Sequence, residues 1–293
     1  MPATVPTLPP PQAHALAAAY DRATATRRLK SLAVAVVIGA LVLLAGWIAE
    51  IRPAAFAHIA NFTDYLAKTI PSISAATPRA DIVGWYWDLR HWAALLGETL
   101  LMAYLGTLAG AIGGFILCFL ASANLIRNPV LRFCTRRYLE FCRTVPDIVF
   151  ALIFVFAFGL GPMPGVFAIA IHTTGALGKL FAEVVENIDM KPVEGLTATG
   201  ASWMQQVRFG VLPQVLSNFA SYALLRFEIN VRGAGVLGFV GAGGIGQEFL
   251  VAIRNFYYTD VSAILLMIIG TVILIDLGTE QVRHRLLSQD QRA

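Results

Sequence analysis

The sequence predicts an all-α integral membrane protein with six transmembrane helices. Of its 293 residues, 57% are hydrophobic and only 14% are charged, and the mean hydropathy of +0.67 is unlike that of a soluble α/β enzyme. Several apolar runs reach about 20 residues, the length that crosses about 30 Å of hydrocarbon. The three cysteines have no metal-ligand spacing, so we interpret them as small buried apolar residues and predict no metal site: Cys118, Cys134 and Cys142.

The N-terminal part of the chain predicts one helix between two polar segments. Residues 1–30 are rich in Ala, Pro and Thr and end in the basic cluster RRLK, so we expect a disordered cytoplasmic tail. Residues 31–51 form the first transmembrane helix, and this run exceeds the roughly 7–15 residues of a signal-peptide core, so we expect an uncleaved anchor. Residues 52–91 carry charges, three prolines and the aromatic cluster GWYWDLRHW, which predict a periplasmic segment that ends at the lipid interface.

Residues 92–285 form the membrane core with the other five spans, and residues 286–293 form a cytoplasmic tail. We expect the spans at 92–123, 132–160, 166–188, 213–232 and 260–277, with GPMPG (161–165) as the tight turn between the third and the fourth. With both termini in the cytoplasm, the inner segments carry 14 of the 22 Lys and Arg residues and the outer segments only five. This bias is typical of a multi-pass membrane protein with both termini in the cytoplasm. The basic character is therefore a topology signal, and we predict no nucleic-acid partner.

Residues 191–212 are too polar to cross a membrane and too regular in pattern to be a plain loop. Pro192 and Glu194 suit a first helical turn, and Gly200 is expected to end this short helix. The sequence SWMQ, beginning at Ser202, matches a capping box and predicts a second short helix that leads into the fifth span. An exposed helix pair of this kind docks into a partner protein or, as the alternative, lies on the lipid surface.

A glycine-rich stretch, GFVGAGGIG, separates the fifth and sixth spans. Gly241, Gly243 and Gly246 spell GxGxxG, but that pattern binds dinucleotides only between a strand and a helix of a βαβ unit, so we expect no such cofactor. Together with Gly244 these residues favour a helix break or gate, because glycine adopts left-handed conformations without strain. The second span repeats a glycine every four positions, which predicts close helix packing: Gly106, Gly110 and Gly114.

Polar residues follow helical spacings inside three spans. The third span carries a stripe of alternating charge, interpreted as pairs that stabilise its inner end or, alternatively, as a gating or partner contact: Arg136, Glu140, Arg143 and Asp147. Pro146 is expected to bend this helix. On the fourth span Lys179 and Glu183 can pair, and on the fifth we expect Glu228 to neutralise Arg232. The candidate pathway residues for an anion are His172, Thr173, Thr174, Arg226, Glu228 and Arg232.

Two of these pathway residues keep a second interpretation. His172 is either a hydrogen-bonded packing residue or, with its threonine neighbours, a contact for the anion. Arg226 has no acid four residues away on its own helix, so it either binds the anion or pairs with Glu98 or another helix's acid.

The loop at 191–212 and its flanks resemble the permeases of ABC importers. Glu194, Gly200 and Pro213 match the spacing of the E-A-A-x3-G-x9-I-x-L-P loop of that family. The chain departs from the two Ala positions and the Ile position of that loop at Gly195, Leu196 and Gly210. These departures, together with IHTTGALGKL, PVEGLTATGA, GVLPQV, RFEINVR and VGAGGIG, resemble the permeases of phosphonate importers, over residues 98–277.

The resemblance implies a type I ABC importer permease architecture. Its implied partners are a second copy of the chain, two ABC ATPase subunits and a periplasmic phosphonate-binding protein, all assembled at the lipid bilayer of the bacterial inner membrane. It also implies that the loop couples to the ATPase through a set of six residues: Glu194, Gly195, Leu196, Gly200, Leu212 and Pro213. ATP and Mg²⁺ are expected on the partner ATPase, because this chain has no G-x-x-x-x-G-K-[ST] sequence, and we predict no cofactor and no catalytic residue in this chain.

The expected cargo is a phosphonate or a related phosphorus oxyanion such as phosphite. An ABC permease for another cargo, such as methionine, and an ion-coupled secondary transporter are the alternatives. A membrane-embedded hydrolase is disfavoured, because the sequence contains neither H-E-x-x-H nor G-x-S-x-G.

Overall fold

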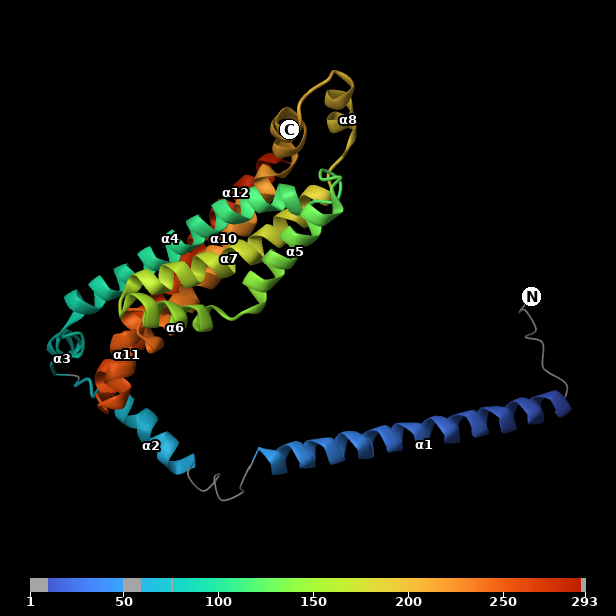
Figure 1. The fold of residues 1–293 in the computed structure, drawn as a ribbon. Helices are drawn as coiled ribbons and strands as arrows, with labels where there is room; N and C mark the ends of the chain where they lie inside the picture. Colours follow the sequence, from blue (N-terminus) through green and yellow to red (C-terminus); the bar gives the residue numbers. More distant parts are fainter. Residues whose placement is uncertain (1–9, 50–58, 75, 291–293) are drawn as a thin grey trace, which may run out of the picture. The chain divides into compact units, whose positions relative to one another are not determined.

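The computed structural model describes residues 10–49, 59–74 and 76–290, and these residues form helices and connections with no strand (Figure 1). The chain divides into two units, Met1–Tyr65 and Leu66–Ala293. The helices are α1 (Pro10–Ile48), α2 (Ile59–Thr69), α3 (Pro78–Trp85), α4 (Leu89–Ala121), α5 (Pro129–Thr144), α6 (Asp147–Phe158), α7 (Pro162–Glu186), α8 (Lys191–Ala198), α9 (Trp203–Gln205), the π-helix η2 (Gln206–Val211), α10 (Leu212–Leu237), the 3-10 helix η3 (Gly238–Val240), α11 (Ile245–Arg254) and α12 (Tyr258–Asp290). The predicted all-α fold is confirmed for the described residues.

Four helices in the described part of the chain are long and apolar enough to cross a membrane, and two bent helix pairs bring the number of candidate spans to six. The four are Thr26–Ile48 within α1, α4, α7 and Tyr258–Leu286 within α12. The pair α5 and α6 bends by 85°, and the pair formed by Trp203–Val240 and α11 bends by 51°. The six predicted spans therefore correspond to four continuous helices and two broken ones.

Helix α1, in the first unit, begins at Pro10, well before the predicted start of the first span. The expectation of a disordered tail is wrong for residues 10–30, because the segment AHALAAAY is rich in strong helix formers and proline is tolerated in a first helical turn. The most apolar part of α1, within Thr26–Ile48, has none of its residues buried inside the protein, as suits a helix surrounded by lipid. Residues 1–9, 50–58, 75 and 291–293 lie outside the described residues. They cover parts of the predicted tails and of the predicted periplasmic segment, and the last two residues of the predicted first span.

The centre of the second unit is the close packing of α4 on α7. A Cβ atom at Gly110 would lie 2.8 Å from the Ala170 carbonyl oxygen, and one at Gly114 would lie 2.8 Å from the Gly178 backbone nitrogen. Gly106 faces Ile169 one turn earlier in the same way. The predicted role of the glycine repeat in helix packing is confirmed, since larger side chains would force these two backbones apart.

The third span is broken where a single bent helix was predicted. Helix α5 ends at Thr144, and α6 begins at Asp147 after Pro146, whose ring has no N–H to continue the ladder of hydrogen bonds. Asp147 therefore belongs to α6 and does not share the face of Arg136, Glu140 and Arg143 on α5.

Two smaller expectations are wrong. The chain turns between α6 and α7 at Gly159 and Gly161, whose φ angles are +88° and +140°, whereas Pro162 to Gly165 already belong to the first turn of α7. A proline in a first helical turn lacks only an N–H that the helix does not use.

Cys118 and Cys142 are buried as predicted, but Cys134 is exposed on α5.

Candidate functional site

Helices α8 and α9 project from one end of the bundle, and α11 lies at the other (Figure 1). As the sequence predicts, α8 has Pro192 and Glu194 in its first turn, and Gly200 ends the turn that follows with a φ of +80°. The backbone N–H of Ser202 donates to Gln205 Oε1 at 2.8 Å, which is one half of the predicted capping box. The chain then enters α10 through the π-helix η2, so the path from Trp203 to Val240 is one helical rod.

The departures of this loop from the importer pattern are linked by a direct contact. Gly210 lies under α8, and a Cβ atom there would meet Val193 Cγ2 at 3.0 Å and Leu196 Cδ1 at 3.1 Å. Leu196 is larger than the Ala of the pattern, and Gly210 is smaller than its Ile. The larger side chain at Leu196 therefore fills the space left by the missing side chain at Gly210, and α8 remains packed on η2.

The outer surface of the α8–α9 segment combines apolar and charged side chains. Met204 and Trp203 are 65% and 36% exposed, and Glu194 is exposed, whereas Val193 and Val207 are buried. A groove lies between this segment and the connection from α4 to α5, lined by Asn124, Leu125, Arg127, Met190, Val193, Glu194, Thr197, Ala198, Trp203 and Gln206. Such a surface suits docking of a protein partner.

A buried polar cluster joins α4, α7 and α10 inside the bundle. The side-chain amide of Asn230 donates to Thr107 Oγ1 at 2.8 Å and to Thr173 Oγ1 at 2.9 Å. Arg226 Nε lies 3.5 Å from the same Thr173 oxygen. Asp147, at the start of α6, exerts an electrostatic attraction on the Arg226 guanidinium. Asp147 is therefore the acid of another helix whose charge acts on Arg226, and the cluster places one cation among hydroxyl and amide groups.

Sequence reasoning found Thr173 and Arg226 but missed Thr107, Asn230 and the electrostatic influence of Asp147. A signal for Asn230 was present, since it lies four residues after Arg226 and thus on the same side of α10. The other two α7 candidates contact different groups. His172 Nδ1 is 3.1 Å from the Val145 carbonyl oxygen at the α5–α6 break, and the Thr174 hydroxyl donates to Ala170 O at 2.8 Å.

The expected pairing of Glu228 with Arg232 is wrong. Arg232 Nη2 lies 2.6 Å from Asp276 Oδ2 on α12. Glu228 accepts a hydrogen bond from Thr279 and lies 3.9 Å from Arg283 Nη1, both on α12. Both residues have partners on the neighbouring helix α12, because Asp276 lies beside Arg232 and Arg283 lies near Glu228.

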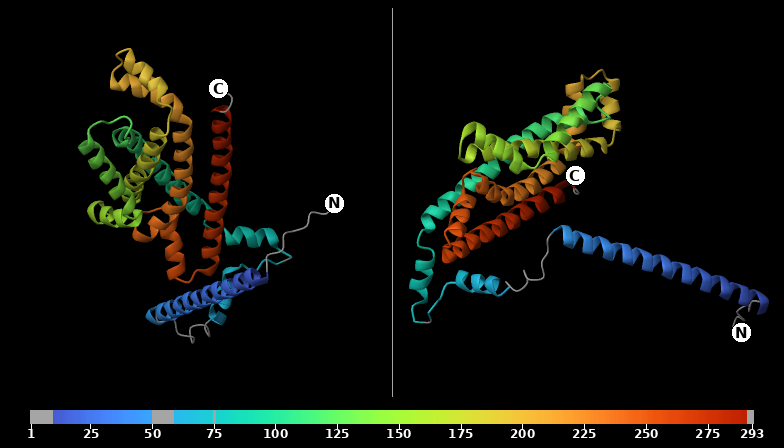
Figure 2. Two further views of the ribbon diagram at one scale, coloured as in Figure 1. Left: turned by 90° about the vertical axis from the view of Figure 1, so that its right-hand side faces the viewer. Right: turned by 60° about the horizontal axis from the view of Figure 1, so that its bottom comes forward.

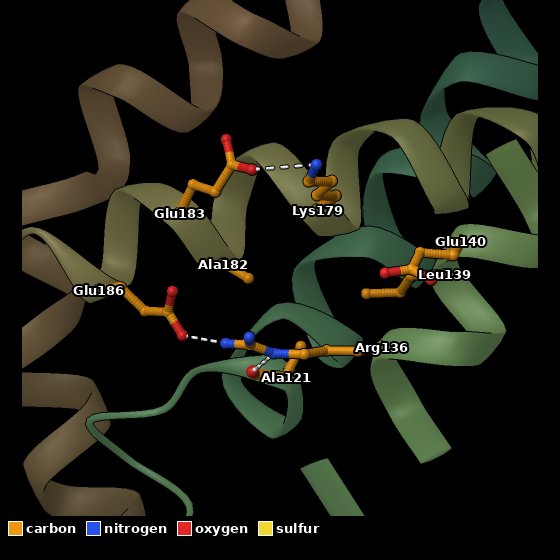
Figure 3. Close-up of a pocket in the computed structure, with 8 residues that line it drawn as sticks. All are labelled: Ala121, Arg136, Leu139, Glu140, Lys179, Ala182, Glu183 and Glu186. Carbon is orange, nitrogen blue, oxygen red and sulfur yellow. Dashed lines mark hydrogen bonds and ion pairs between the residues drawn. The ribbon is translucent and has the colours of Figure 1, made fainter. Parts of the chain in front are cut away.

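The charged side chains of α5 and α7 enclose a small cavity near the α8 end (Figure 3). Arg136 forms an ion pair with Glu186 and donates through Nε to Ala121 O at 2.8 Å, while Lys179 pairs with Glu183 at 3.4 Å as predicted. Glu140 lines the same cavity of about 130 Å³ but pairs with Arg137 at 2.7 Å. The lining carries three carboxylates and two cations, and each of these side chains has an ion-pair partner. The slight excess of negative charge does not suit the binding of an anion.

The glycine stretch forms a break between η3 and α11, as predicted. Gly241, Gly243 and Gly244 have φ angles of +90°, +77° and +72°, a region that residues with side chains rarely adopt. Gly246 is instead helical, in the first turn of α11, where it lies against the backbone of Gly235. The Thr99 hydroxyl accepts from the Ile245 N–H at 2.9 Å and fixes the break to α4.

These features define a class of protein: a multi-pass helical membrane protein with a polar cluster inside its bundle, a glycine break at one end and a projecting helix pair at the other. The chain belongs to the family of binding-protein-dependent transport system inner membrane components, whose model matches residues 106–286. It is the permease subunit of an ABC importer, and this family assignment favours that class over the ion-coupled transporter and the hydrolase.

The similar proteins carry related names. A phosphite transport system permease protein of Stutzerimonas stutzeri is 38% identical over 246 residues, which cover 83% of this chain and 84% of that protein. A cryptic phosphonate transport system permease protein of Escherichia coli (strain K12) is 48% identical over 120 residues, which cover 41% of this chain and 98% of that protein. Among solved structures, an inward-facing methionine ABC transporter is 20% identical with a TM-score of 0.57, and the match covers 67% of this chain and 95% of that one. At that identity the likeness shows the fold alone.

Proposed function

We propose that this permease carries a phosphonate, phosphite or a similar phosphorus oxyanion into the cell. The observation that carries the proposal is Arg226, a partly buried cation that shares the Thr173 hydroxyl with Asn230 inside the bundle. A guanidinium suits a phosphorus oxyanion, because its planar N–H groups donate charge-assisted hydrogen bonds. The names of the similar proteins support the same cargo class.

The proposed machine contains two copies of this chain, two ATPase subunits that hold ATP and Mg²⁺, and a periplasmic binding protein that delivers the anion. Both chain termini and the α8–α9 segment face the cytoplasm in this arrangement, as the distribution of Lys and Arg favours. The residues that contact the ATPase are Glu194, Gly195, Leu196 and Gly200, with Leu212 and Pro213 starting the helix that carries the motion inward.

Transport proceeds by alternating access. Closure of the ATPase dimer moves α8, and the rod from Trp203 to Val240 passes this motion to the glycine break at Gly241, Gly243 and Gly244, with Gly246 anchoring α11. The loose geometry around Arg226, with Nε 3.5 Å from its hydroxyl partner, favours a transient contact that lets the anion leave.

The cargo is tested by uptake of labelled methylphosphonate in cells that hold the matching ATPase and binding protein, with and without this chain. We expect uptake that requires the chain, is reduced by unlabelled phosphite and is unaffected by methionine. Competition by methionine with none by phosphite would replace the phosphorus oxyanion by an amino acid as the cargo and would keep the ABC machine.

The coupling role of α8 gives a second prediction. Glu194→Ala removes an exposed carboxylate without touching the buried Val193, so the permease should reach the membrane at the normal level. We expect binding-protein-stimulated ATP hydrolysis to fall about tenfold. A loss of this size lies within the coupling free energy of about 1–3 kcal/mol that is typical between two sites. Glu280→Ala is the matched control, because it also removes an exposed carboxylate, here from α12. Unchanged stimulation in the Glu194 variant would contradict the coupling assignment.

A further inference from the structure

Asp147 is held in place where the third span is broken. Its Oδ1 atom accepts the N–H of Ile148 at 2.9 Å in the first turn of α6, where the helix dipole favours a negative charge. The Val145 carbonyl oxygen, just before the break, lies 3.1 Å from His172 Nδ1 on α7. The carboxylate is therefore fixed by its own helix, and the break is fixed to α7.

The other carboxylate oxygen of Asp147 faces α10. Asp147 Oδ2 lies 3.4 Å from the position that a Cβ atom at Gly233 would take. Gly233 follows Arg226 by seven residues and Asn230 by three, so at about 100° per residue the three positions share one face of α10. Helix α7 lies beside both α6 and α10 (Figure 2), and its Thr173 hydroxyl is shared by Arg226 and Asn230. Asp147 and Arg226 thus belong to one polar cluster.

Within the described residues, Arg226 has an attracting charge but no ion-pair partner. Asp147 exerts an electrostatic attraction on its guanidinium, yet none of the ion pairs among these residues includes Arg226. The bond from its Nε atom to Thr173 is long, at 3.5 Å, and no hydrogen bond in the described part of the chain engages its two terminal amino groups. The Nη edge of the guanidinium is therefore free, while a fixed negative charge acts on it.

We propose that Asp147 is the internal counter-ion of Arg226 and competes with the anionic cargo for its charge. The inference rests on the proposed contact between cargo and Arg226 and adds how that contact is released. Charges at membrane depth are costly unless an opposite charge balances them, and Asp147 supplies that balance when no cargo is bound. An incoming oxyanion competes with this attraction and binds less tightly for it. A transport site needs weak binding, because cargo that is held tightly cannot leave.

Asp147→Asn tests the counter-ion role, because asparagine keeps the shape of the side chain and an oxygen that can accept the Ile148 N–H. The permease–ATPase complex, purified without the binding protein and placed in lipid nanodiscs, is dialysed against labelled methylphosphonate. We expect the variant to bind this anion about tenfold more tightly than the natural chain, because a nearby competing charge acts strongly at the low effective dielectric constant of a protein. In the complete importer, slower release should lower its uptake at saturating cargo. Arg226→Met, added to Asp147→Asn, should abolish the gain in binding.

Asp276→Asn is the matched control, because it removes a carboxylate that pairs with a different arginine, Arg232, and leaves Arg226 unchanged. This control should bind methylphosphonate as weakly as the natural chain does. A loss of folding does not produce a gain in binding, so the measurement separates the counter-ion role from a purely structural one. An equal gain in both variants, or no gain in Asp147→Asn, would overturn the proposal, and so would tighter binding without slower uptake.

Uptake by the natural chain and by Arg226→Met keeps this test apart from the proposed function. If the natural chain takes up no methylphosphonate, the proposed cargo is wrong. If Arg226→Met takes it up normally, the anion contact is wrong, and the counter-ion role fails with it. Uptake that requires both the chain and Arg226, together with unchanged binding in Asp147→Asn, would leave the proposed function standing and remove the counter-ion role alone.

Discussion

Replacing Gly246 by alanine should prevent the permease from folding stably in the membrane. A Cβ atom at this position would overlap the Gly235 carbonyl oxygen, and it would lie 3.3 Å from the Gly238 Cα atom. Both neighbours are backbone, so no side chain can turn away to make room. Overpacking of this kind costs about 1–3 kcal/mol and more where the backbone must shift, which is a large part of the stability of a typical protein.

The measurement is the amount of monodisperse permease recovered from membranes, together with its thermal unfolding midpoint. Gly235→Ala is the matched control, because it lies in the same contact but has open space where its own Cβ atom would go. We expect the control to behave as the natural chain and the Gly246 variant to be recovered poorly or to unfold several degrees lower. Equal recovery and equal midpoints for the two variants would show that α11 does not dock on α10 through these glycines.

Replacing Arg226 by methionine should reduce anion uptake by about 10- to 100-fold, the effect of losing a charge-assisted hydrogen bond of about 1.5–3 kcal/mol. Methionine keeps the length of the side chain and removes the cation. Asn230 still bonds Thr173 and Thr107 in this variant, so the contact among α4, α7 and α10 is preserved. Arg226→Lys keeps the charge but not the planar fork and should restore uptake in part.

Uptake at matched membrane levels is the readout, with Arg254→Met as control because Arg254 is an exposed cation at the end of α11. If uptake by the Arg226 variant equals that of the control, Arg226 serves only to balance the Asp147 charge.

The positions of the spans could be predicted from the sequence because hydrophobic length and turn residues are local signals. The predicted fourth span, 166–188, and the observed α7, Pro162–Glu186, agree closely. The interruptions were harder to foresee. Pro146 was expected to bend a helix, but the 85° break also depends on the Val145 carbonyl, which finds a partner in His172 on another helix. Nothing local at Gln206–Val211 indicates a π-helix.

The α8–α9 segment was predicted more completely than the polar interior, for a physical reason. Capping boxes and helix-ending glycines act within a few residues, so Ser202 and Gly200 could be recognised from spacing alone. Pairs inside the bundle are decided by which helices meet and at what height. Glu228 and Arg232 have the right spacing to pair, yet each is satisfied by α12.

The unbroken path from Trp203 to Val240 gives the subunit a mechanical element. At about 1.5 Å per residue it is a lever arm of about 57 Å, stiffened along its length by backbone hydrogen bonds. A tilt of about 5° at one end of such an arm displaces the other end by about 5 Å, which is comparable to the rise of one helical turn. In the proposed transport cycle, the length of the arm would set the amplitude of a gate at the glycine break, so small movements of α8 would open or close a path across the bilayer without any flexible linker between them.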